Sequence, residues 1–192
     1  MRRVAAGVGA LCVWALLASG CVRTPEPSPT PTPKPSFQCT PEAGGDAYPC
    51  DQHDYERMVQ RDAEYVEAER IAKRVRELSD ELLVSKQPIN DELRSLATGE
   101  TQAGLESALA DASATGVDFS GAREIAWVKR APYISDRGSV IALEVCTTPG
   151  TMTYTVDGVQ YSPTSTLEQV FFSRSGEVLQ ISSIITSEVD QC

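Results

Sequence analysis

Hydrophobic residues recur at helical spacing along residues 52–85, a stretch that contains neither glycine nor proline. The apolar positions follow three- and four-residue steps, which predicts one long amphipathic helix. Asp51 is a good N-cap for it, and Asp54 suits the positive end of its dipole. The charged face of such a helix is either solvated or a partner site. The apolar stripe comprises Tyr55, Val59, Val66, Ile71, Val75, Leu78 and Leu82.

Two shorter helices are predicted next. Pro88 can start the first, because proline suits the opening turn of a helix, and Gly99 ends it. A second apolar pattern runs from Thr101 to Thr115 and stops at Gly116.

Beyond Gly116 the pattern changes from helical to alternating, which is typical of strands. Ile125 and Trp127 are expected to share one face of the first strand, and Ile141, Leu143 and Val145 one face of the second. The chain therefore predicts an α+β fold, with three N-terminal helices packed on a curved antiparallel sheet of four or five strands. Strands are expected near residues 125–127, 140–146, 151–156, 167–172 and 178–185.

The strands carry enough bulky aliphatic residues to fill the space beneath the sheet. We therefore expect a packed interior or a small dry pocket. The residues that should fill it are Ile141, Leu143, Val145, Leu179, Ile181 and Ile185.

The N-terminus has the three zones of an export signal. Arg2 and Arg3 precede an apolar stretch over residues 4–17, and small residues follow at positions 18–20. The apolar stretch is shorter than the roughly 20 residues that a membrane-spanning helix needs, so cleavage is expected.

The residues around the expected cleavage site, Leu16-Leu17-Ala18-Ser19-Gly20-Cys21, resemble the lipobox of bacterial lipoproteins. The resemblance implies that residues 1–20 are a signal peptide and that Cys21 is lipidated with fatty acyl chains such as palmitate. It also implies that the membrane is a partner through this lipid, and that the protein lies on the outer face of the cytoplasmic membrane. The alternative is an ordinary secretory signal that contains a cysteine.

A proline-rich linker is predicted over residues 21–38, because proline occupies every second position from Pro25 to Pro35. Such a segment favours extended polyproline II and would span roughly 50 Å at about 3.1 Å per residue. A ligand for a proline-binding groove is the alternative. Residues 39–192 are then expected to form a single extracytoplasmic domain.

The charge balance argues against nucleic acid as a partner. The chain has 17 basic and 27 acidic residues, and loss of Arg2 and Arg3 with the signal would make it still more acidic. A nucleic-acid-binding chain needs a concentrated basic face, which no run of Lys or Arg supplies.

Four cysteines remain once Cys12 leaves with the signal and Cys21 is lipidated. An even set in an exported chain predicts two disulfides. Cys39 is expected to pair with Cys50, because the residues between them are turn-rich, and Cys146 then pairs with Cys192. A metal site is the rival interpretation, but the chain has no Cys-x-x-Cys and His53 is its only histidine, so no metal and no other cofactor are expected.

Scattered residues resemble a group of uncharacterised actinobacterial lipoproteins with a cone-shaped fold similar to nuclear transport factor 2, SnoaL and ketosteroid isomerases. This fold frequently encloses a pocket between helix and curved sheet, and it hosts both enzymes and binding modules. The matching residues are Leu96-Ala97-Thr98-Gly99, Leu105, Leu109, Gly116, Cys146, Ser175-Gly176 and Cys192.

Two functions remain open. The favoured one is a non-catalytic module that binds a surface protein, a wall component or a small ligand. The alternative is an isomerase- or hydrolase-like enzyme with a pocket carboxylate as base and a tyrosine as hydrogen-bond donor. A large open cavity with such a residue turned inward would favour the enzyme. No catalytic residue is predicted outright, and the candidates are Glu124, Glu144, Glu168, Tyr133, Tyr154 and Tyr161, with His53 expected at the helix surface.

Overall fold

The computed structural model describes residues 36–192. The predicted signal peptide, Cys21 and the proline-rich residues up to Pro35 lie outside this range, so the predictions made for them are not tested by the fold. None of the helices in residues 36–192 is long and apolar enough to cross a membrane.

Three helices precede the main sheet, as the sequence predicts. Helix α1 (Gln52–Ser85) is capped by Asp51, whose side chain accepts a hydrogen bond from the Asp54 amide. Helix α2 (Asp91–Leu96) starts later than predicted, at Asp91 rather than Pro88, because the Asn90 side chain caps it at the Leu93 amide. Helix α3 (Gly99–Ala114) begins at the glycine that was expected to end α2.

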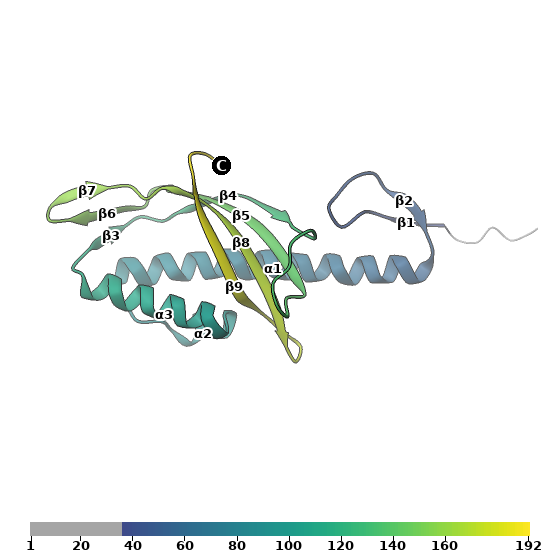
Figure 1. The fold of residues 1–192 in the computed structure, drawn as a ribbon, viewed down its shortest axis with the longest axis horizontal. Coiled ribbons are helices and arrows are strands. Elements are labelled where there is room, and N and C mark those ends of the chain that lie inside the picture. Colours follow the sequence, from purple (N-terminus) through teal and green to yellow (C-terminus); the bar gives the residue numbers. More distant parts are fainter. Residues whose placement is uncertain (1–35) are drawn as a thin grey trace, which may run out of the picture. The chain divides into compact units, whose positions relative to one another are not determined.

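Nine strands form three antiparallel sheets, in the part of the chain that the structure describes. The four-stranded sheet has the order β4-β5-β8-β9, the three-stranded sheet the order β3-β6-β7, and the third sheet pairs β1 with β2 (Figure 1). The strands are β1 (Phe37–Cys39), β2 (Tyr48–Cys50), β3 (Asp118–Ser120), β4 (Glu124–Arg130), β5 (Ile141–Thr148), β6 (Thr153–Val156), β7 (Val159–Tyr161), β8 (Ser165–Ser175) and β9 (Val178–Val189).

The strand predicted over residues 151–156 does not join the main sheet. It is β6, which pairs with β3 on one side and β7 on the other. Asp157 and Gly158 connect β6 to β7, and both have positive φ angles, of 51° and 79°, as a two-residue hairpin turn requires. Strands β1, β2, β3 and β7 were not predicted, since each has only three residues and too little alternation to detect.

The main hydrophobic core lies between α1 and the four-stranded sheet. Ile71, Val75 and Leu78 of α1 are buried in one cluster with sheet residues that include Leu143 and Phe172. Val59 and Val66 were predicted on the same stripe, but they are 48% and 66% exposed. Val59 lies in the N-terminal part of α1, which extends beyond the four-stranded sheet toward the β1–β2 hairpin (Figure 1). Val66 lies between Tyr65 and Ala68, which are both buried in the core, so its own side chain points away from the core.

Two β-bulges change which side chains face the helices. In β4, Ile125 pairs with Thr147 but Trp127 pairs with Cys146, so the two lie on opposite faces rather than on one face as predicted. In β9, Ile181 pairs with Phe172 and Ser183 with Phe171, which leaves Ser182 without a partner. Each extra residue inverts the alternation that follows. Ile185 consequently lies on the outer face, 52% exposed, and not in the interior.

Both predicted disulfides are present. Cys39–Cys50 closes the β1–β2 hairpin, with its Cα atoms 5.9 Å apart. Cys146–Cys192 attaches the C-terminal residue to β5, with a Cα separation of 5.7 Å. The Trp127 indole nitrogen also donates a hydrogen bond of 3.1 Å to the Cys192 carbonyl oxygen. The C-terminal end is therefore fixed to the outer face of the sheet.

Candidate functional site

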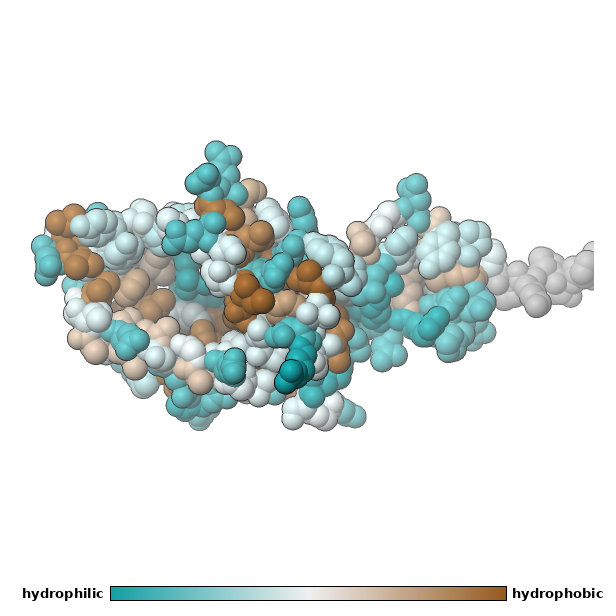
Figure 2. All heavy atoms as spheres, viewed as in Figure 1, coloured by the Kyte–Doolittle hydropathy of each residue, from teal (hydrophilic) through white to brown (hydrophobic). Residues whose placement is uncertain are grey.

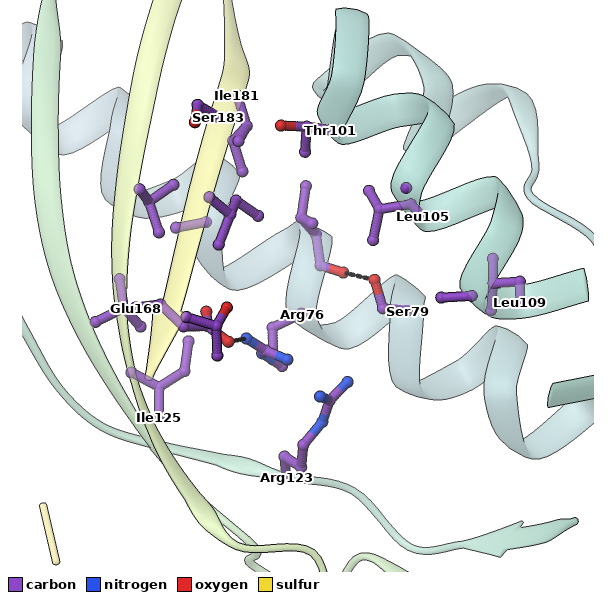
Figure 3. A pocket seen from close by; sticks show the side chains of 18 of the residues that line it. Arg76, Ser79, Thr101, Leu105, Leu109, Arg123, Ile125, Glu168, Ile181 and Ser183 are labelled. Carbon is purple, nitrogen blue, oxygen red and sulfur yellow. Dashed lines mark hydrogen bonds and ion pairs between the residues drawn. The ribbon is translucent and has the colours of Figure 1, made fainter. Parts of the chain in front are cut away.

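A cavity of about 510 Å³ lies between α1, α3 and the inner face of the four-stranded sheet (Figure 3). Most of its wall is aliphatic, and no aromatic side chain contributes to it. Eight of the twenty lining residues are polar, and four of these are charged: Arg76, Glu100, Arg123 and Glu168. A pocket of this size with a largely aliphatic wall and several polar groups has the character of a small-molecule site. The aliphatic wall consists of Ala72, Val75, Leu83, Leu105, Ala108, Leu109, Ile125, Val145, Val170, Ile181 and Ile184.

Each helix presents one face to the cavity. The lining residues of α1 are at positions 72, 75, 76, 79 and 83, and those of α3 at 100, 101, 104, 105, 108 and 109, both at helical spacing. The α3 face carries the small residues Gly104 and Ala108, so it leaves space that larger side chains would fill. A Cβ atom at Gly104 would have no other heavy atom within 4 Å, apart from its own helix turn.

Glu168 reaches the cavity because of its place in the sheet. It pairs with Val145 across β8 and β5, and both residues point toward the helices. The Glu168 carboxylate forms an ion pair with the guanidinium of Arg76 from α1, and the Thr166 hydroxyl lies 3.5 Å from the same carboxylate oxygen. The side chains of Arg76 and Glu168 are only 15% and 9% exposed. A pair removed from water to this extent must satisfy both charges internally.

A second ion pair lies beside the first. The Arg123 amide and its Nε atom each donate a hydrogen bond of 2.8 Å to the Asp80 carboxylate, and Nη2 donates as well. Asp80 is nearly completely buried, and the Arg123 side chain is 24% exposed. In Figure 3 the Arg123 side chain extends from the segment before β4 toward Arg76. Two guanidinium groups therefore border the same end of the cavity.

Two glycines position the backbone that carries Arg123. Gly121 has a φ angle of 83°, and a Cβ atom there would lie 2.2 Å from the Thr151 carbonyl oxygen. Gly150 has a φ angle of 55°, and its Cβ would lie 2.6 Å from the Ala122 carbonyl oxygen. The segment before β4 and the turn after β5 thus cross at a separation that only glycine allows.

The expectation of a packed interior or a small dry pocket is wrong. Gly104 and Ala108 of α3 are too small to fill the space, and the bulge at Ser182 turns Ile185 outward. Arg76 and Glu168 enter the cavity from opposite walls, which the aliphatic pattern of the strands did not indicate.

Among the carboxylates proposed as bases, Glu168 alone lines the cavity. Glu124 is exposed at the start of β4. Glu144 points to the outer face of the sheet, where it lines a separate hollow with Lys129 and Tyr133. A hydrogen bond to the Glu144 carboxylate raises the pKa of Tyr133, and burial contributes less.

The proposed tyrosine donors lie away from Glu168. Tyr133 is exposed beside the outer hollow, and Tyr154 and Tyr161 stack with ring centroids 5.4 Å apart in the three-stranded sheet. None of the three lines the cavity. The cavity thus meets the criterion set for the enzyme through Glu168, but the tyrosines suggested as hydrogen-bond donors do not lie beside that carboxylate.

His53 lies on the exposed first turn of α1, close to Asp51 and Asp54. One potential ligand atom from each of the three residues lies within 4.8 Å of the others. Asp51 caps the helix and Asp54 forms an ion pair with Arg57, so helix capping accounts for the arrangement. Nothing else at this position points to a metal ion.

No protein-family model, curated protein or solved structure matches the chain. The function must therefore be argued from the cavity and the charged residues that border it.

Sequence reasoning missed Arg76, Asp80 and Arg123. The sequence did contain a signal for Arg76 and Asp80. At helical spacing, both positions fall on or beside the face of α1 that carries Ala72, Val75 and Ser79. A charged residue on the buried arc of a helix needs a partner, and that requirement predicts an inward-facing ion pair. Arg123 had no such signal.

Proposed function

We propose that this protein is an exported lipoprotein, anchored through Cys21 to the outer face of the cytoplasmic membrane, whose domain binds a small, largely apolar molecule in the α1–α3 cavity. The domain acts as a binding module and performs no chemistry on its ligand. Of the three partners that the sequence left open, a surface protein, a wall component or a small ligand, the proposal selects the small ligand.

The cavity is the observation that carries this proposal. Its volume of about 510 Å³ falls in the range of small-molecule sites, roughly 300–1,000 Å³. Its aliphatic wall can bury the apolar body of a ligand, and two guanidinium groups supply hydrogen-bond donors at one end. In Figure 2, hydrophobic residues are visible in the hollow between the strands and the helices.

The N-terminal sequence supports the location. The lipobox-like residues before Cys21 and the alternating prolines after it fit a lipid anchor followed by a semi-rigid spacer. The resemblance to the cone fold supports the same proposal, since a cavity between a long helix and a curved antiparallel sheet is the feature that this fold uses to bind ligands.

A cone-fold enzyme is the second candidate, and the inward position of Glu168 favours it over a docking module with a closed core. In that case Glu168 would take a proton from the substrate, and Arg76 and Arg123 would stabilise the resulting negative charge. The binding module is preferred because none of Tyr133, Tyr154 and Tyr161 lines the cavity beside Glu168, and because the one hydroxyl at the centre of the α1 wall, Ser79, donates to the Val75 carbonyl oxygen.

Filling the cavity tests the binding function. Gly104→Leu places a side chain into open space at an ordinary helical φ angle. We expect it to reduce binding of the neutral apolar fluorophore N-phenyl-1-naphthylamine at least about tenfold, because the cavity volume is occupied. Replacing glycine also favours the helix by about 0.5–1 kcal/mol, so the loss of binding should occur without loss of stability.

The matched control is Ala110→Leu, which adds a similar side chain to an exposed position of α3 that does not line the cavity. The fluorescence titration compares the affinity for the probe between Gly104→Leu and Ala110→Leu. Any probe taken up by detergent or lipid in the sample contributes equally to both variants and cancels. Equal binding by the wild type and Gly104→Leu would contradict the proposal.

A further inference from the structure

Two ion pairs hold the charged groups at one end of the cavity before any ligand enters. Arg76 pairs with Glu168, and Arg123 pairs with Asp80. All four side chains are at least three-quarters buried, with exposures between 5% and 24%. These four groups together therefore carry no net charge, and the lining has one further carboxylate, Glu100 of α3.

The guanidinium groups keep hydrogen-bond donors that these pairs do not use. Arg76 donates to Glu168 through Nη2, and Arg123 donates to Asp80 through Nε and Nη2. Within residues 36–192, Arg76 Nε, Arg76 Nη1 and Arg123 Nη1 form no hydrogen bond. An arginine offers five such donors, so a ligand oxygen can be held without breaking either ion pair.

Glu168 also keeps one free oxygen. Its Oε1 atom accepts from Arg76 and lies within reach of the Thr166 hydroxyl, whereas its Oε2 atom has no donor among residues 36–192. The site thus offers donors and an acceptor side by side. A group that both accepts and donates, such as an amide, complements this pattern.

An anion is a poorer match. Its attraction to Arg76 and Arg123 would be opposed by repulsion from Glu168 and Asp80, and Glu100 adds a further carboxylate to the lining. Moving an ion from water into such a site leaves one charge uncompensated, which is costly away from solvent. A neutral carbonyl gains the same hydrogen bonds without that cost.

Resting on the proposed function, we propose that the ligand is a neutral aliphatic molecule with an amide or ester carbonyl, and not a fatty-acid anion. The carbonyl oxygen accepts from Arg76 and Arg123, and an amide N–H donates to Glu168 Oε2. The body is aliphatic because the apolar part of the wall is formed by aliphatic side chains.

Three probes of equal chain length test this preference on the purified full chain: decanamide, methyl decanoate and decanoate. Competition at equal concentrations, read by native mass spectrometry, is expected to give most complex with the amide, less with the ester and at least about tenfold less with the carboxylate. Decanoate binding as well as or better than decanamide would overturn the inference while leaving the proposed function intact. Failure of all three probes would overturn the inference, and failure of N-phenyl-1-naphthylamine as well would overturn the proposed function.

Glu168→Gln provides an independent test through charge. The substitution frees the Arg76 charge, so we expect the preference to shift toward decanoate by at least about tenfold relative to decanamide. Glu144→Gln is the matched control, because Glu144 lies on the outer face of the same sheet and should leave the preference unchanged. An unchanged preference in Glu168→Gln would also overturn the inference.

Discussion

The Tyr65 side chain connects the disulfide-closed loop to α1. Its hydroxyl donates a hydrogen bond of 2.7 Å to the Glu42 carboxylate, and the Arg130 guanidinium lies over its ring, 4.6 Å from the centroid. Arg61 of α1 adds a hydrogen bond of 3.1 Å to the Thr40 carbonyl oxygen. Burial and the bond to Glu42 together raise the pKa of Tyr65 above its ordinary value of 10.0.

This raised pKa predicts how stability changes in alkaline solution. Below pH 10 the phenol is protonated in both folded and unfolded chains, and its contribution is complete. As the pH rises above 10.0, the unfolded chain releases the proton first, so the free energy of unfolding falls. Tyr65→Phe should lower stability by about 1 kcal/mol at neutral pH and reduce the alkaline fall.

Urea unfolding of the wild type and Tyr65→Phe at about pH 9 and about pH 11 measures this difference. Contributions from the other tyrosines are common to both proteins and cancel in the comparison. An identical fall in both proteins would show that the Tyr65 phenol is not held by the folded state.

The elements were predictable where local signals determine them. The Asp51 cap and the absence of glycine and proline defined α1, and the turn-rich residues between Cys39 and Cys50 indicated their disulfide. The bulges at Ala126 and Ser182 were not predictable, because an extra residue in a strand leaves no mark in the local pattern. Those bulges decide which residues face the helices, so the composition of the inner face was predicted only in part.

The crossing of Gly121 and Gly150 is the element-scale feature that places Arg123 beside the cavity. Gly121→Ala should destabilise the fold by roughly 3 kcal/mol, because it combines a positive φ angle with a backbone clash at Thr151. Thermal or urea unfolding measures the loss.

Gly158→Ala separates the cost of the positive φ angle from the cost of the backbone clash. Gly158 has a similar φ angle, 79°, but a Cβ atom there meets nothing within 4 Å. It should therefore cost only about 1 kcal/mol, the contribution of the backbone conformation alone. Equal losses for the two variants would show that the close crossing does not constrain the segment that carries Arg123.

At the scale of the whole molecule, the candidate site depends on residues far apart in the chain. Arg76 and Glu168 are separated by 92 positions, so only the packing of α1 on the register of β8 brings them together. Sequence reasoning could nominate Glu168 as one of several carboxylates, but it could not distinguish the inward Glu168 from the outward Glu144 without that register. The export and lipid-anchor features remain predictions from the N-terminal sequence.

Cys21→Ser tests the anchor. A serine cannot form the thioether to the diacylglyceryl group, so we expect the variant to lose fatty-acid label and to leave the membrane fraction. Cys12→Ser is the control, since Cys12 lies within the predicted signal and its loss should leave labelling unchanged. Metabolic labelling with a clickable fatty acid measures both, and equal labelling of the wild type and Cys21→Ser would exclude Cys21 as the acylation site.

The location of a bound ligand tests the central proposal most directly. Other apolar surface exists, including Val156 and Val159 at the tip of the β6–β7 hairpin, where Figure 2 shows hydrophobic residues. Methyl NMR of the purified chain titrated with decanamide distinguishes the two places. Binding in the cavity predicts shifts of the methyl groups of Val75, Val170 and Ile181, which line it. Shifts confined to Val156 and Val159 would contradict the proposal that the cavity is the binding site.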